Sequence, residues 1–170
     1  DTLVVNGALL GSGLDDIGDC DVNFDGKIRL AGLTVEQKPA SIDVKYRWRC
    51  LKPVDRNYWC FTHILDEQNK VIGYLDHQVL GGEPPMLQWR EGEVAVEHLR
   101  YVFQPRYPES ARRLRVGLYD LPSGERLKIV MSSRAEGMEL SLTDDGTAIL
   151  VDLGSNAVKA NAKKPHNTIR

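Results

Sequence analysis

The clearest periodic segment of the chain spans residues 40–51, where apolar and charged residues alternate one by one. Its apolar positions are Ile42, Val44, Tyr46, Trp48 and Cys50, and its charged positions are Asp43, Lys45, Arg47 and Arg49. Successive side chains of a β-strand point to opposite faces of the sheet, so this pattern predicts a strand with one buried and one solvated face. An α-helix would instead distribute these charges around its whole axis.

Residues 57–65 follow a different pattern, because apolar side chains occupy both alternating phases. One phase carries Tyr58, Cys60 and Ile64, and the other carries Trp59, Phe61 and Leu65. We therefore expect a central strand that is covered on both of its faces.

Other short segments with apolar residues recur along the chain, separated by turn-forming residues. They predict further strands at residues 3–5, 27–35, 70–75, 93–103, 113–119, 126–131, 138–142 and 147–153. The turn Asp144-Asp145-Gly146 predicts that the last two form a hairpin. No segment keeps a helical apolar period over three turns. Nine or ten short strands without helices between them predict an all-β fold, an antiparallel β-sandwich of jelly-roll or immunoglobulin-like character.

Length and composition fit one globular domain. The chain has 170 residues, of which 42% are hydrophobic and 27% are charged, enough to bury a core. We expect a single sandwich domain over residues 1–158 and a disordered basic tail over residues 159–170. The net charge of −2 argues against nucleic acid as a partner, because such proteins need a basic surface. No run approaches the roughly 18 apolar residues of a transmembrane helix, so no membrane span is expected in this chain.

Residues 21–28 match the first eight positions of an EF-hand-type calcium loop. Asp21, Asn23 and Asp25 would donate oxygen ligands, and Gly26 would allow the sharp turn. The twelfth position falls on Gly32, where a bidentate carboxylate should complete the shell. The alternative is an Asx-rich turn that leads into a strand. Calcium is the one cofactor that the sequence suggests, and it would make the domain a calcium-stabilised structural or protein-interaction module.

The three cysteines, Cys20, Cys50 and Cys60, lack the spacing of a metal site. A hairpin centred on Asp55 would place Cys50 opposite Cys60, which would allow a cross-strand disulfide in an oxidising compartment. Buried free thiols are the alternative interpretation.

Aromatic residues are the candidates for contact with a ligand, because their faces stack on sugar rings. Trp59, Trp89, Tyr58 and His77 are the expected exposed contact residues for a carbohydrate. The alternative for each is packing in the core, which we expect for Trp48 because it lies on the apolar phase of its strand.

A hydrolase that uses His63 or His77 with Asp66 or Asp76 is a third hypothesis. Catalysis needs a nucleophile, a base and an orienting group that converge. The sequence contains no G-x-S-x-G elbow, no H-E-x-x-H motif and no Gly-rich phosphate loop. We therefore predict a binding protein without catalytic residues.

Four stretches of the chain carry a family resemblance: FDGKIRLAG (24–32), KYRWRCLKPVDRNYWCFTHILDEQNKVIGYLDH (45–77), PPMLQWREGEV (84–94) and RVGLYDLPSGERL (115–127). Together they resemble the soluble β-sandwich domain at the C-terminal end of bacterial membrane glycosyltransferases of the dolichyl-phosphate-mannose type. The resemblance implies an extracytoplasmic accessory domain, in the periplasm or at the cell surface, beside a membrane protein that uses lipid-linked sugars. A glycan or a lipid-linked sugar is then the expected ligand.

Overall fold

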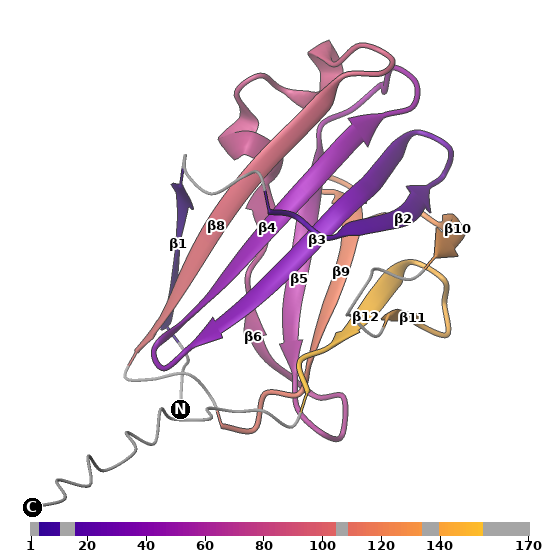
Figure 1. The fold of residues 1–170 in the computed structure, drawn as a ribbon. Coiled ribbons are helices and arrows are strands. Elements are labelled where there is room, and N and C mark those ends of the chain that lie inside the picture. Colours follow the sequence, from indigo (N-terminus) through magenta and orange to yellow (C-terminus); the bar gives the residue numbers. More distant parts are fainter. Residues whose placement is uncertain (1–3, 11–15, 105–108, 134–139, 155–170) are drawn as a thin grey trace, which may run out of the picture.

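The computed structural model of the chain describes residues 4–10, 16–104, 109–133 and 140–154. Over this part the chain forms two antiparallel sheets that lie face to face, with only short 3₁₀ turns besides the strands (Figure 1). The predicted all-β sandwich is therefore confirmed. The tail predicted at residues 159–170 lies outside the described residues.

The first sheet has six strands in the order β1-β8-β4-β3-β2-β10. Their bounds are β1 (Val4–Leu10), β2 (Asp19–Phe24), β3 (Ile28–Lys38), β4 (Ser41–Cys50), β8 (Val94–Gln104) and β10 (Ile129–Ser133). Strands β2, β3 and β4 follow one another as hairpins, whereas β8 and β10 arrive from the second sheet.

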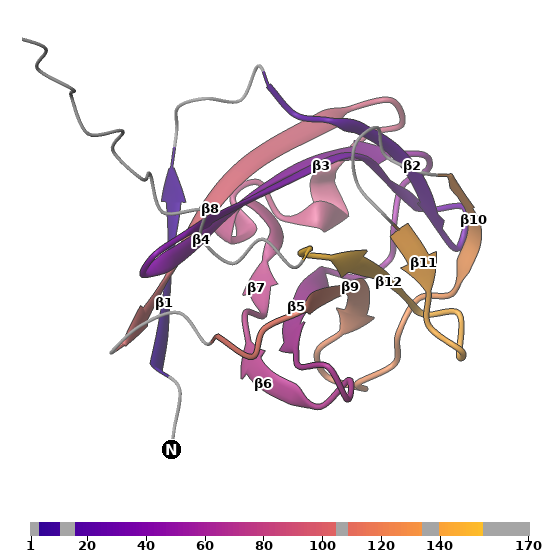
Figure 2. The ribbon, with the colours of Figure 1, turned by 60° about the horizontal axis from the view of Figure 1, so that its bottom comes forward.

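The second sheet has the order β11-β12-β9-β5-β6, and the short strand β7 also pairs with β5. Its strands are β5 (Tyr58–Leu65), β6 (Val71–Tyr74), β7 (His77–Gln78), β9 (Arg113–Asp120), β11 (Leu140–Leu142) and β12 (Ala148–Asp152). Two 3₁₀ turns, η1 (Val79–Gly82) and η2 (Met86–Gln88), connect β7 to β8. Figure 2 shows the second sheet beneath the long strands of the first.

Every strand segment that the sequence predicts coincides with an observed strand, and β11 and β12 form the predicted hairpin with Gly146 at φ +66°. Within the described residues there are twelve strands instead of nine or ten, because β2 and β7 were not predicted. Strand β2 exposes Asp19 and half-buries Asp21 and Asn23, while the residues between them are buried. The Asp and Asn residues at these positions are typical of a loop, but in the structure they form the solvent-facing side of a strand.

The apolar phase of β4 forms the centre of the core. All five of its apolar side chains, from Ile42 to Cys50, are fully buried, and the Trp48 and Tyr46 rings stack with centroids 5.7 Å apart. Trp48 is therefore a core residue, as predicted. Strand β5 is buried on both phases apart from the half-buried Trp59, which confirms the expectation for a central strand.

The hairpin predicted around Asp55 is wrong. The chain crosses from β4 in the first sheet to β5 in the second, so Cys50 and Cys60 lie in different sheets. A turn signal does not distinguish a hairpin from a crossing between sheets. Cys20, Cys50 and Cys60 are buried free thiols, so the alternative to the disulfide is the one observed.

Candidate ligand-binding site

A pocket of about 220 Å³ lies where the β2–β3 turn, the start of β5 and the connection from β9 to β10 meet. Most of its wall is charged, with cations and carboxylates in similar number. The cations are Lys27, Arg56, Arg126 and Lys128, and the carboxylates are Asp25, Asp120 and Glu125. Tyr58 and Leu127 complete the wall. The pocket therefore offers hydrogen-bond donors and acceptors together.

Lys27 and Asp25 form an ion pair on one side of the pocket, with 2.9 Å between Nζ and Oδ2. Lys27 Nζ also lies 3.5 Å from the Tyr58 hydroxyl and 5.9 Å from the centre of its ring. The hydrogen bond to Asp25 raises the pKa of Lys27 above its usual value.

Asp120 anchors another part of the wall. Its Oδ2 accepts hydrogen bonds from the Ser123 hydroxyl at 2.5 Å and the Ser123 amide at 3.3 Å, and it lies 3.4 Å from Arg56 Nη1. Gly124 turns the chain here with φ +72°. These contacts fix the turn after β9, and the residues that follow it line the pocket.

The outer face of the second sheet begins beside the pocket. Trp59 pairs with Tyr119 across β5 and β9, and Tyr119 forms an isolated β-bridge with Arg126. The Arg126 guanidinium lies 4.5 Å from the centre of the Phe61 ring. Because Arg126 also lines the pocket, it joins the pocket to this face. Trp59 and Tyr119 are half-buried, so part of each ring remains open to solvent.

Gly117 leaves room for the Phe61 ring on the outer face. The two residues are direct partners across β5 and β9. A Cβ at position 117 would come within 2.3 Å of Phe61 Cζ and 2.7 Å of the Thr147 carbonyl oxygen. The absence of a side chain here therefore makes room for the ring that supports Arg126.

Further along the same face, His63 lies between Arg115 and Asp76. Arg115 Nη2 donates to His63 Nδ1 at 2.8 Å, which leaves the proton of the neutral ring on Nε2. Nε2 lies 3.1 Å from Asp76 Oδ1. We call Phe61, His63, Arg115 and Arg126 the outer cluster.

His63 of the outer cluster contacts Asp76, which is one pair of the hydrolase hypothesis, but it does not contact Asp66. Asp66 Oδ1 instead accepts hydrogen bonds from the Gln68 and Lys70 amides, as a turn residue does. Both nitrogens of His63 are engaged, so neither is left to activate a nucleophile.

The exposed ligand contacts predicted from the sequence are placed differently. Tyr58 is only 3% exposed, yet it lines the pocket. Trp89 is 4% exposed and donates from Nε1 to the Pro84 carbonyl oxygen, so its expected exposure is wrong. The short η2 turn folds this indole back onto the core. Trp59 alone of the four lies on the outer face with a partly open ring.

His77, the fourth predicted contact, belongs to a buried polar group that the sequence did not reveal. The Glu97 side chain is fully buried, and its oxygens accept from Trp48 Nε1 at 2.9 Å and the Leu80 amide at 2.8 Å. His77 Nε2 lies 2.9 Å from the same carboxylate, and the Tyr101 hydroxyl lies 3.2 Å from Nδ1. We call these five residues the inner cluster. The available signal was the position of Glu97 on the inward phase of β8.

The three predicted calcium ligands each have another partner. Asp21 pairs with Arg29 at 3.1 Å, Asn23 Oδ1 accepts from the Gly26 amide at 2.7 Å, and Asp25 pairs with Lys27. The Asn23 contact is the Asx turn of the alternative interpretation. Within the part of the chain that the structure describes, no three His, Cys, Asp or Glu side chains are grouped to hold a metal ion.

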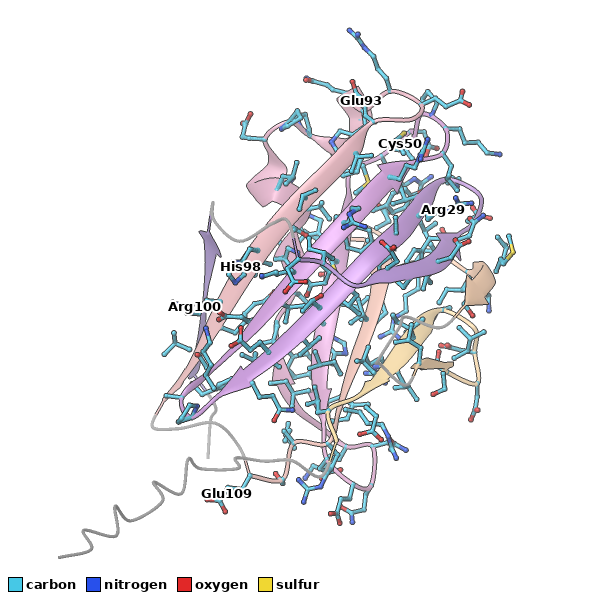
Figure 3. All side chains as sticks on the ribbon, viewed as in Figure 1. Arg29, Cys50, Glu93, His98, Arg100 and Glu109 are labelled. Carbon is cyan, nitrogen blue, oxygen red and sulfur yellow. The ribbon has the colours of Figure 1, made fainter. Side chains whose placement is uncertain are left out.

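The outer face of the first sheet is also charged, and its buried carboxylate, Asp43, is paired. Asp43 is buried beneath its neighbours and accepts from Arg100 Nε at 2.8 Å, Arg100 Nη2 at 2.9 Å and Lys38 Nζ at 2.6 Å. His98, next to Arg100 on β8, adds a 3.4 Å contact (Figure 3). This carboxylate is thus satisfied by the chain itself.

Comparison with known proteins gives no information on function, so any functional inference rests on the fold and the site. No family model matches the chain, and no curated protein or solved structure matches it. The described residues include no helix with the length and apolar character needed to cross a lipid bilayer.

Proposed function

We propose that this domain is a non-catalytic accessory module that binds carbohydrate, with the pocket beside Tyr58 as its sugar site. The observation that carries the proposal is the pocket wall, which combines four cationic donors with three carboxylates in about 220 Å³. Sugar hydroxyls both donate and accept hydrogen bonds, so a wall that offers both kinds of group matches them.

The pairing of the charges favours a neutral polyhydroxylated ligand over an anion in this pocket. Lys27 is already paired with Asp25, and Arg56 with Asp120. A strong anion would have to compete with these carboxylates for the same cations. A hydroxyl group can bridge such a pair without separating the two charges.

Aromatic side chains beside the pocket support the same ligand class. Tyr58 forms part of the wall, and Trp59 and Tyr119 follow on the outer face, joined to the pocket through Arg126. Aromatic rings combine a large apolar face with little loss of conformational entropy, which suits contact with the C–H face of a sugar. The volume is below the range of about 300–1,000 Å³ usual for drug-sized ligands, which favours a single sugar ring in the pocket.

The cellular setting of this proposal comes from the resemblance of residues 24–130 to domains of membrane glycosyltransferases. That resemblance favours a position outside a bacterial membrane and a ligand taken from glycans or lipid-linked sugars. The non-catalytic role is supported by His63, whose ring nitrogens are both engaged by Arg115 and Asp76.

The test is an NMR titration of the ¹⁵N-labelled chain with a panel of neutral mono- and disaccharides chosen from a glycan array. We expect saturable shifts at the amides of residues 25–27, 56–58 and 125–128, which line or adjoin the pocket. Arg56→Ala and Glu125→Ala should each weaken binding about tenfold, equivalent to about 1.4 kcal/mol.

Arg49→Ala provides the matched control, because Arg49 is an exposed cation on the outer phase of β4 in the other sheet. It should leave the affinity unchanged. The absence of saturable shifts with every sugar, or an equal loss in the Arg49 variant, would disprove the proposal.

A further inference from the structure

We propose that the outer face of the second sheet holds a second site, which binds an oxyanion at Arg115 and Arg126. The ligand chemistry is a carboxylate or a phosphoryl group. The inference does not depend on sugar binding in the pocket, although Arg126 also forms part of the pocket wall.

Arg115 supplies the first observation. Its Nη2 is used by His63, but its Nε is buried and has no hydrogen-bond partner among the described residues. A buried N–H group without a partner costs free energy, and native proteins almost always satisfy such groups with protein atoms, water or a ligand. The Nε–H group of Arg115 is therefore a donor that the described part of the chain leaves unused.

Arg126 supplies the second observation. Its guanidinium is held over the Phe61 ring and forms no hydrogen bond or ion pair with any other residue that the structure describes. A guanidinium stacked on an aromatic ring still presents its N–H groups at its edge, in a fork that fits two oxygens of a carboxylate or phosphate. Unlike Lys27 and Arg56 in the pocket, this cation pairs with no carboxylate of the described residues.

The electrostatics of the outer cluster point the same way. Burial lowers the pKa of Arg115, and the positive charge of Arg126 lowers it further, while the charges of Asp145 and Asp76 act in the opposite direction. The neighbouring carboxylates are engaged elsewhere: Asp76 by His63, and Asp145 by the hydroxyls of Thr143 and Thr147. An added anion would relieve the repulsion between the two guanidinium groups.

Arg113 shows what a structurally satisfied arginine looks like on the same strand. It lies two residues before Arg115 on β9, on the same face, and its Nη1 donates to Asn69 Oδ1 at 2.5 Å. This contact leaves Arg113 with a partner from the chain. Arg113 is therefore the matched control for a change at Arg115.

The experiment is a titration of the ¹⁵N-labelled chain with inorganic phosphate, with D-glucuronate and with D-glucose, at ionic strength held constant with sodium chloride. We expect phosphate or glucuronate to shift the Nε–H signals of Arg115 and Arg126 saturably, and glucose to leave the signal of Arg115, which does not line the pocket, in place. Stronger binding of phosphate would identify a phosphate ester as the natural ligand, and stronger binding of glucuronate an acidic sugar; both support the site.

Arg115→Gln and Arg126→Gln should each weaken anion binding at least tenfold, whereas Arg113→Gln should change it less than about twofold. If Arg115→Gln loses the amide dispersion of the folded chain, the half-buried Arg126 carries the test alone. Glu125→Ala should leave anion binding intact, which separates this site from the pocket. No saturable shift with either anion, or an equal loss in the Arg113 variant, would overturn the proposal.

Discussion

The inner and outer clusters are built from similar residues but differ in whether the chain satisfies them. In the inner cluster, Glu97 receives hydrogen bonds from the Trp48 indole and the Leu80 amide and contacts His77, all from within the chain. In the outer cluster, Arg115 keeps an unpartnered buried Nε, and the Arg126 guanidinium stacks on the Phe61 ring without a hydrogen bond or ion pair among the described residues. Residue type alone therefore does not distinguish a structural polar group from one available to a ligand.

Position between or outside the sheets explains the difference. The inner cluster lies in the core, where water cannot replace a missing partner, so each polar group must be matched by the fold. In the outer cluster, Arg115 and Arg126 are half-buried, so solvent or a ligand can reach part of each side chain. Partners there can come from outside the chain, and the fold tolerates donors that it does not use.

The largest effect should come from removing one indole N–H from the inner cluster. Trp48→Phe deletes the donor to Glu97 and part of a fully buried ring, so we expect a loss of about 2–4 kcal/mol in the free energy of unfolding. Trp59→Phe, at the half-buried partner of Tyr119, should cost less than about 1 kcal/mol. Urea unfolding of both variants measures the two changes in the free energy of unfolding. Equal changes would show that the inner cluster and the outer face contribute alike to stability.

Asp43 separates two properties, position on an outer face and the lack of a partner. It lies on the outer face of the first sheet, yet its hydrogen-bond partners all come from the chain. Hydrogen bonds from Arg100 and then Lys38 lower its pKa well below the usual range, against the opposing effect of burial. Asp43→Asn should cost about 1.5–3 kcal/mol at pH 7.

The pH dependence gives the sign of this effect. The folded protein keeps Asp43 ionised to lower pH than the unfolded chain does, so the stabilisation is fully present above the unfolded pKa of about 3.9 and is lost as the pH falls toward the folded value. Urea unfolding from pH 7 to pH 3 should show the wild type approaching the Asn variant. A difference that stays constant over this range would contradict the assignment.

A side chain at Gly117 would disturb the outer cluster through the Phe61 ring, its partner across β5 and β9. Gly117→Ala places a Cβ against the Phe61 ring, and we expect a loss of about 1–3 kcal/mol in the free energy of unfolding. The double variant Phe61→Leu with Gly117→Ala should recover part of it, since the smaller side chain can move. No recovery in the double variant would show that the strain arises elsewhere, for example at the Thr147 carbonyl.

The smallest effect concerns calcium. Because Asp21, Asn23 and Asp25 already have partners, melting with calcium and with a chelator should give midpoints within about 1 °C of each other. A rise of several degrees with calcium that Asp21→Asn abolishes would restore the calcium site.

Much of the fold could be predicted, because alternation of side chains carries direct information about a strand. The rhythm of residues 40–51 predicted both β4 and its buried face, and the two-phase pattern of residues 57–65 predicted a covered β5. Strand β2 was missed because its outward residues are Asp and Asn, which also form turns. A crossing between sheets carries the same turn residues as a hairpin, so the Cys50–Cys60 pairing failed.

The site could be predicted only in part, because it depends on which strands become neighbours. Tyr58 and Trp59 were predicted together as exposed contacts, but they lie on opposite phases of β5: Tyr58 is buried at the pocket and Trp59 is half-buried on the outer face. Arg115 and His63 are 52 residues apart, and only the pairing of β5 with β9 brings them together. Glu97 showed a local signal as an acid on an apolar phase, whereas the unpaired state of Arg126 has no local signature.

The most direct test compares the free energies of unfolding of Glu97→Gln and Arg126→Gln in the same buffer. Glu97→Gln replaces an acceptor oxygen with an amide donor in a fully buried cluster, and we expect it to lose about 1.5–3 kcal/mol. Arg126→Gln removes a cation that the described chain does not use for hydrogen bonding, and stability should change by less than about 0.5 kcal/mol. Equal losses in the free energy of unfolding, or a larger loss for Arg126→Gln, would contradict the claim that the inner cluster stabilises the fold while Arg126 is available to a ligand.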